Sequence, residues 1–144
     1  ELGASVLTTR GSYQWNPNLD CEVDAYFHFS FSLLLRAVIA GDRLAIYLRD
    51  RFTCLYCCAD LHGAAPSDIT LDHLVPDSKG GSNSPRNLIT ACRACNCSRQ
   101  DKPVSRFAGP EARKHIARNR ARSLTKYRTL AKAIIAGESD DPRK

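Results

Sequence analysis

The sequence predicts an α+β domain that is stabilised by a bound metal ion and flanked by helices. First, Cys-x-x-Cys pairs occupy residues 54–57 and 92–95, and each pair can supply two sulfur ligands to one ion. Second, residues 70–75 show a short strand pattern that ends at a proline. Third, the apolar residues of 111–136 recur at helical spacing, which predicts a long helix. A length of 144 residues fits one compact domain with appended helices.

The segment from residue 51 to residue 102 is the part that needs a metal ion. It is rich in Cys, Gly, Asn and Pro and has only short apolar runs, so it can bury little apolar surface for its length. A structural metal ion is therefore the expected source of its stability. Residues 79–85 are expected to form a loop, and residues 88–91 fit either a second strand or the start of a helix.

Helices are expected on both sides of this segment. The apolar positions of residues 43–50 lie at helical spacing, and Asp42 is suited to cap that helix. The long helix of 111–136 has one apolar face and one face of lysine and arginine. Pro110 suits its first turn and Gly137 suits its end.

The N-terminal part gives a less specific pattern. Residues 1–20 are expected to be a loop or a loosely ordered arm. Residues 26–33 alternate aromatic with small or polar side chains, as a strand does, whereas residues 33–40 fit a helix better. Strand and helix both stay open for this stretch.

The cysteines point to zinc rather than to disulfides. The chain contains seven cysteines, and an odd number argues against a closed disulfide framework. Buried free thiols or disulfides are the alternative, but two Cys-x-x-Cys pairs fit metal binding in a reducing compartment better. Cys58 and Cys97 lie next to ligands and could compete for the ion, while Cys21 is expected to be a buried thiol. The predicted ligands of a structural zinc ion are Cys54, Cys57, Cys92 and Cys95.

The charge balance favours an anionic partner. Lysine and arginine number 21 against 15 aspartate and glutamate residues, which gives a net charge of +6. Nucleic acid is the first candidate for such a partner. The most apolar stretch, residues 26–40, is too short and too interrupted to span a membrane, and residues 1–20 show no secretory signal pattern. We therefore expect no membrane association and a cytoplasmic location.

Polar residues that suit phosphodiester hydrolysis lie between and just after the cysteine pairs. Asp72 and His73 are adjacent, Asn87 follows, and Asn96 comes directly after Cys95. Carboxylate and amide oxygens suit a hard divalent cation, and histidine can take a proton from water near neutral pH. From the residues alone, Asp72 and His73 fit equally a hydrogen-bonding pair at a strand end, and Asn87 fits a turn former or helix cap.

A resemblance to a known family joins these residues. Over residues 43–107 the sequence resembles the cysteine-flanked branch of the HNH endonuclease family. The resemblance is carried, in the order and spacing of the family, by Arg-Asp-Arg-Phe-Thr-Cys-Leu-Tyr-Cys at 49–57, Leu-Asp-His-Leu-Val-Pro at 71–76, Lys-Gly-Gly-Ser-Asn at 79–83, Asn-Leu at 87–88 and Ala-Cys-Arg-Ala-Cys-Asn at 91–96. Cys58 departs from the small residue that usually follows the second cysteine.

The resemblance implies a ββα-metal, treble-clef-like core and a role for each motif residue. His73 would be the general base, Asp72 and Asn96 would bind a catalytic Mg²⁺ or Mn²⁺ ion, and Asn87 would help to orient the base. The predicted nucleic-acid-binding residues are Lys79, Arg86, Arg99, Lys102, Arg118 and Arg122. Solvated surface charge is the alternative for Arg99 and Lys102, and an ordinary docked amphipathic helix is the alternative for the basic helix.

The predicted function is metal-dependent hydrolysis of DNA, with RNA as a further possible substrate and weak sequence specificity. A non-catalytic zinc module that binds DNA or RNA is the alternative. Partners would be the nucleic acid and, for specificity, machinery such as phage packaging proteins in a bacterial or phage-infected cell. A monomer would nick and a homodimer could cut both strands. The expected division is an N-terminal arm (1–42), a nuclease core (43–107), a basic helix (108–137) and a tail (138–144).

Overall fold

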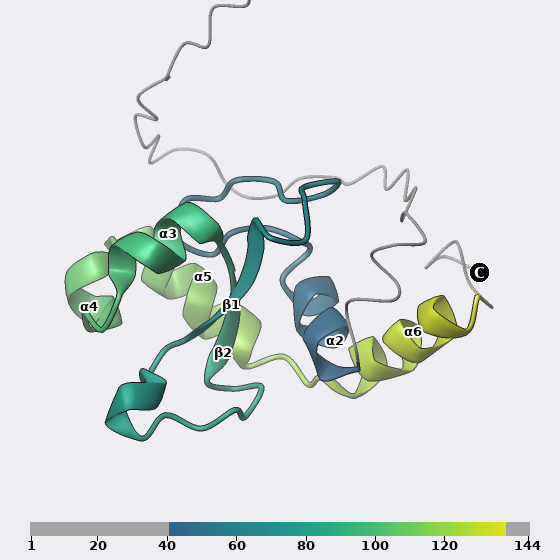
Figure 1. Cartoon of the computed structure of the whole chain (residues 1–144). Helices are drawn as coiled ribbons and strands as arrows, with labels where there is room; N and C mark the ends of the chain where they lie inside the picture. The colour runs from purple at the N-terminus through teal and green to yellow at the C-terminus, as the bar shows by residue number, and fades with distance from the viewer. Residues whose placement is uncertain (1–40, 138–144) are drawn as a thin grey trace, which may run out of the picture.

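The computed structural model describes residues 41–137 (Figure 1). The expected N-terminal arm, the strand or helix of 26–40, Cys21 and the tail 138–144 lie outside this range. The described elements are α2 (Asp42–Arg49), β1 (Ile69–His73), the short 3-10 helix η1 (Asp77–Lys79), β2 (Leu88–Cys92), α3 (Arg93–Arg99), α4 (Val104–Phe107), α5 (Pro110–Arg120) and α6 (Thr125–Ala136).

An antiparallel hairpin of β1 and β2 forms the centre, with Ile69 opposite Cys92 and His73 opposite Leu88. Residues 88–92 are therefore a strand, which decides between the two possibilities left by the sequence. Helix α3 begins at the residue after β2, and the side chain of Cys92 caps it by accepting a hydrogen bond from the backbone N–H of Cys95 (3.4 Å). The order β1–β2–α3 is the expected ββα unit within an α+β fold.

The first strand ends at His73, two residues earlier than predicted. The backbone N–H of Leu74 still donates to the carbonyl of Asn87 (2.8 Å), but the backbone of Val75 is bound by the side chain of Asn87 instead of by β2. Side-chain hydrogen bonds thus replace the strand ladder from Val75 onward, which a propensity pattern does not reveal.

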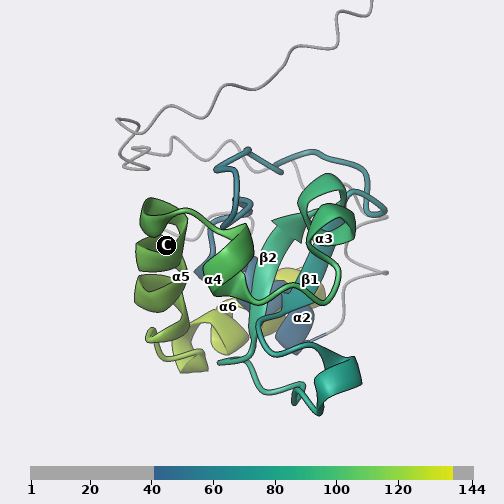
Figure 2. The same cartoon turned by 90° about the vertical axis from the view of Figure 1, so that its left-hand side faces the viewer.

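Helices cover the hairpin on both sides. Helix α3 contacts both strands, whereas α2 and α5 contact β2, and α3 and α5 appear on either side of the hairpin in Figure 2. Leu44, Ile46, Phe52 and Ile89 are buried where α2 and the segment after it meet the hairpin. Removing these side chains from water contributes about 1.5–3 kcal/mol each to stability.

A buried ion pair at the end of α2 fixes that helix to the hairpin. Arg49 is 1% exposed and donates to both carboxylate oxygens of Asp50 (2.8 and 2.9 Å) and to the carbonyls of Pro85 and Leu88 (both 2.8 Å). Asp50 in turn accepts from the backbone N–H of Thr90 in β2 (2.9 Å). Every charge of the pair is therefore hydrogen-bonded, as a buried pair requires.

The predicted cap of the first helix is wrong. Asp42 is the first residue of α2 and makes no capping hydrogen bond; Gly41 precedes the helix. The Asp42 carboxylate instead accepts two hydrogen bonds from Arg128 in α6 (2.7 and 2.8 Å), an interaction that links helices distant in sequence.

The single long helix predicted for 111–136 is also wrong, because the chain bends between α5 and α6 at residues 121–124. Arg122 in this bend donates to the carbonyl of Arg49 (3.3 Å), and the hydroxyl of Ser123 accepts from the backbone N–H of Thr125 at the start of α6 (3.4 Å). The bend lets α6 pack along α2 while α5 packs against β2 (Figure 1).

The predicted ends of the helical region are confirmed. Pro110 is the first residue of α5, and Gly137 ends α6 with a left-handed backbone conformation (φ 76°). Within residues 41–137, no helix has the length and apolarity that crossing a bilayer would require.

Candidate metal centre and active site

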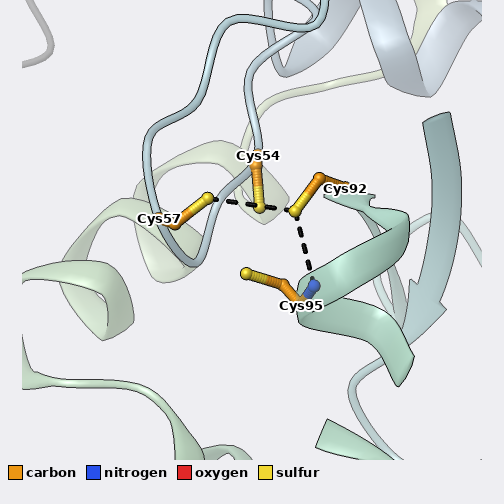
Figure 3. Close-up of side chains that lie close together, drawn as sticks. All are labelled: Cys54, Cys57, Cys92 and Cys95. Atoms are coloured by element: carbon orange, nitrogen blue, oxygen red, sulfur yellow. Dashed lines mark hydrogen bonds between the residues drawn. The ribbon is translucent and has the colours of Figure 1, made fainter. Parts of the chain in front are cut away.

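The four predicted zinc ligands converge on one point (Figure 3). The Sγ atoms of Cys54, Cys57, Cys92 and Cys95 all lie within 4.8 Å of one another. A tetrahedral zinc ion with bonds of about 2.3 Å separates its sulfur ligands by about 3.8 Å. The Sγ atoms of Cys57 and Cys92 are 3.9 Å apart, so the cluster has the size and the chemistry of a structural zinc site. Neither Cys58 nor Cys97 belongs to the cluster.

Two different elements supply the ligands. Cys54 and Cys57 lie in a tight loop after α2, in which the Cys54 carbonyl accepts from the backbone N–H of Cys58 (2.8 Å). Cys92 ends β2 and Cys95 lies in the first turn of α3. An ion at this point would therefore tie the loop to the hairpin and α3.

The cluster shifts the pKa values of Cys57 and Cys95 in opposite directions. Hydrogen bonds from the thiols of Cys54 and Cys95 lower the pKa of Cys57 to about 4. Hydrogen bonding with Cys54 and Cys57 raises the pKa of Cys95, and burial and the repulsion between neighbouring thiolates raise it further. Thiolate is the form that binds zinc, and a bound dication would relieve this repulsion.

Asp72 is buried on the α3 side of β1. It is 5% exposed, and its Oδ2 accepts a hydrogen bond of 2.6 Å from the hydroxyl of Tyr56. Its Oδ1 pairs with the guanidinium of Arg99. Burial raises the pKa of the Asp72 carboxyl, and the hydrogen bond from Tyr56 and the charge of Arg99 oppose that rise. The sequence analysis assigned no role to Tyr56, because its contact with Asp72 depends on the tertiary structure.

Arg99 lies inside the protein rather than on its surface. It is 1% exposed and donates to the carbonyls of His73 (2.7 Å) and Leu74 (2.8 Å) in addition to Asp72. The sequence prediction placed this side chain on a phosphate. In the structure it satisfies backbone carbonyls at the end of β1 and neutralises Asp72, so it offers no charge to solvent.

His73 follows Asp72, and because consecutive strand residues alternate between the faces of β1, the two can serve one site only where that alternation stops at the end of the strand. His73 is the last residue of the strand, and its Nε2 is 2.7 Å from Oδ1 of Asn83. With that amide oxygen as acceptor, Nε2 carries the proton, and Nδ1 keeps a lone pair that can accept one. Asn83 was part of the motif region, but its contact with His73 arises only because the loop folds back.

Asn87 holds this loop rather than the histidine itself. Its side chain accepts from the backbone N–H of Val75 (2.9 Å) and donates to the carbonyls of Val75 (3.1 Å) and Ser82 (2.9 Å). A Cβ at Gly81 would lie 1.8 Å from the carbonyl oxygen of Val75, so only glycine fits there. Asn87 and Gly81 thus fix the loop that brings Asn83 to His73.

Asn96 is held by a hydrogen-bond chain that leaves one of its atoms available. Its Nδ2 donates to the hydroxyl of Thr70 (3.0 Å), which donates to the carbonyl of Ala91 (2.8 Å). The amide oxygen of Asn96 is therefore turned away from this chain. Together with the Asp72 carboxylate, whose oxygens each retain a second acceptor site, it forms a donor set with the chemistry that Mg²⁺ or Mn²⁺ prefers. The charge of Arg99 beside Asp72 would compete with such an ion.

Residues 54–102 match the family model described as HNH endonuclease. This part of the chain is similar to an HNH endonuclease domain. It covers about a third of the chain and contains the cysteine cluster, both strands and α3. The comparisons with curated proteins and with solved structures gave no match. An HNH domain indicates a nuclease or another nucleic-acid-related function.

The predicted nucleic-acid-binding residues lie partly within the matched residues 54–102 and partly after them. Lys79 is the last residue of η1 and donates to the carbonyl of Asp101 (2.7 Å), and Lys102 donates to the carbonyl of Ser98 (2.9 Å). Both lysines and Arg86 are exposed. Arg118 is exposed on α5, outside the HNH domain, and Arg122 is half-buried in the bend before α6. The basic side chains therefore form two groups, one near the loop 77–87 and one along α5.

Proposed function

We propose that this protein is a metal-dependent endonuclease that hydrolyses phosphodiester bonds of DNA, with His73 as the general base. The observation that carries the proposal is the pairing of His73 with Asn83 at the end of β1 in an HNH domain. An imidazole whose Nε2–H is engaged presents Nδ1 as an acceptor, and this is the state that a general base needs.

In this mechanism Nδ1 of His73 takes a proton from the attacking water. Asn83 keeps the ring in one tautomer and orientation, and Asn87 keeps the loop of Asn83 in place. Asp72 and Asn96 would hold a divalent ion, which when bound stabilises negative charge on the phosphoryl and leaving oxygens. The products would carry 5′-phosphate and 3′-hydroxyl ends.

Exposed basic residues near the loop would position the substrate. Lys79, Arg86 and Lys102 are exposed and lie in the HNH domain, so they are the proposed contacts to backbone phosphates. Such contacts fix the register of the nucleic acid without reading its sequence. Weak sequence specificity, or specificity supplied by a partner protein, follows from that, and RNA remains a second substrate to test.

The second candidate is a zinc module that binds nucleic acid without cutting it. One observation favours it: both oxygens of Asp72 already accept hydrogen bonds, one of them from the buried cation Arg99. A fixed positive charge at this carboxylate weakens the binding of a divalent ion. If Arg99 prevents a divalent ion from binding to Asp72, the protein binds DNA and does not cleave it.

Incubation of supercoiled plasmid with the protein distinguishes the two functions. Nicking that requires Mg²⁺ or Mn²⁺, stops with EDTA and is lost in His73→Ala supports the endonuclease. The matched control is His62→Ala, which removes an exposed imidazole from a different loop and should nick like the wild type. Wild-type protein that shifts DNA in a gel but leaves the plasmid intact at every metal concentration would refute the endonuclease and support the binding module.

A further inference from the structure

A second polar site lies on the far side of β2 from His73. It is a cavity of about 150 Å³ between α5 and the segment 50–58. The backbone N–H of Leu55 donates to the carbonyl of Thr90 (3.0 Å), so this segment runs along the edge of β2 that β1 does not occupy. The cavity is therefore separated from His73 by the whole hairpin.

The side chains around this cavity are mostly cationic or neutral. Its lining includes Arg51, Arg118, Arg122 and His115. The one carboxylate in the lining, that of Asp50, is neutralised by Arg49 and accepts a further hydrogen bond from the backbone of β2. Three arginines thus line a small polar space, and the thiolate of Cys54, which also lines it, would be bound by the zinc ion. Such a field attracts an anion.

The backbone around the cavity holds an uncommon conformation. Arg51 (φ 56°) and Cys58 (φ 58°) are non-glycine residues with positive φ, and both line the cavity. Glycine adopts this conformation at little cost, whereas residues with a Cβ are destabilised in it. Strain of this kind persists where a side chain is needed for function. Arg51 thus keeps a cationic side chain at a backbone position that would favour glycine.

We propose that this cavity binds one phosphate group of a nucleic-acid backbone, at a distance from the bond that is cut. The volume admits a phosphate group. Guanidinium groups bind phosphate oxygens through paired, charge-assisted hydrogen bonds, and three of them can enclose one group. The proposal rests on the proposed nucleic-acid function and adds Arg51 and His115 to the arginines of α5 and the bend.

Arg51→Gly separates this proposal from a purely structural role. The substitution removes both the guanidinium and the backbone strain, so it should raise the melting temperature while it weakens DNA binding. Arg118→Ala removes a second guanidinium from an exposed helix position. Lys132→Ala on α6 is the matched control, since it removes one exposed positive charge away from the cavity.

Binding of a labelled duplex is measured by fluorescence anisotropy in EDTA over a series of salt concentrations. Loss of one phosphate contact lowers the slope of log K against log salt by about 0.9, which is about a fivefold loss of affinity near 0.15 M salt. We expect this loss in the double variant Arg51→Gly/Arg118→Ala and a smaller one in each single variant. Slopes equal to that of Lys132→Ala would overturn the proposal.

NMR distinguishes a nucleic-acid phosphate from a small phosphate ion. Duplex DNA should shift the signals of His115 and Asn119, which line the cavity. Shifts caused by inorganic phosphate alone, and absent with DNA, would also overturn the proposal. Because these measurements need no cleavage, a wild type that fails to nick plasmid but keeps the slope difference would refute the endonuclease and leave the phosphate site standing.

Discussion

Substitution of Asp72 by asparagine tests whether this carboxylate supports the fold as well as the chemistry. Asparagine keeps the shape of the side chain and can still interact with the hydroxyl of Tyr56. It removes the negative charge that pairs with Arg99, whose side chain is only 1% exposed. The guanidinium would then remain buried without a counter-ion.

The expected loss of stability follows from the partners that Arg99 keeps. Breaking a buried ion pair on one side costs about 3–5 kcal/mol. Arg99 retains its hydrogen bonds to the carbonyls of His73 and Leu74, so the loss should lie at the lower end, about 3 kcal/mol. A domain of this size has a free energy of unfolding of about 5–15 kcal/mol, so the variant should still fold but with a much smaller free energy of unfolding.

Urea unfolding followed by circular dichroism, at a fixed zinc concentration, measures this loss. Asp68→Asn is the control, because Asp68 is exposed just before β1 and its carboxylate has no buried partner to lose. A loss below about 1 kcal/mol for Asp72→Asn would refute the argument, since it would mean that Arg99 does not depend on the carboxylate. If the loss is near 3 kcal/mol, inactivity of an Asp72 variant cannot by itself be assigned to metal binding.

Three further predictions concern the zinc cluster, the base and the contact between helices. Chelation of zinc, or Cys57→Ser, should unfold the segment around the cluster, because structural zinc contributes on the order of 10 kcal/mol; zinc content and melting temperature report this. Asn83→Ala should lower kcat about fivefold with KM unchanged, since it removes one hydrogen bond that orients His73, whereas Asn83→Asp keeps the acceptor and should retain more activity; equal rates would contradict the role. The pKa of Asp42 is lowered, chiefly by the hydrogen bond from Arg128. This pair therefore adds stability above the ordinary carboxyl pKa of about 3.9 and loses it as the pH falls through the folded-state pKa, so Asp42→Asn should differ from the wild type in melting temperature at pH 7 and not at pH 2.

Much of the fold was predictable where the signal is local in the sequence. The zinc ligands follow from two Cys-x-x-Cys spacings, because a pair of thiols two residues apart can chelate one ion before any distant contact forms. The first strand and the ends of the helical region followed from proline, glycine and apolar spacing, whereas residues 88–92 fitted either a strand or a helix until the pairing with β1 decided for a strand. The strand boundary at His73 and the break between α5 and α6 did not follow from local signals, because side chains from remote segments decide them.

The sequence by itself determined the metal cluster, the HNH motif and the positive charge of this protein, since each depends on residue type and on short spacing. Only the tertiary structure decided which neighbours those residues have. Asp72 meets Tyr56 and Arg99, which lie 16 and 27 residues away, and a long loop returns Asn83 to His73. Arg99 illustrates the difference. A basic residue after the motif suggests a surface contact with phosphate. In the structure Arg99 is buried and binds the Asp72 carboxylate and the carbonyls of His73 and Leu74, and these electrostatic interactions are stronger in the interior than they would be in water.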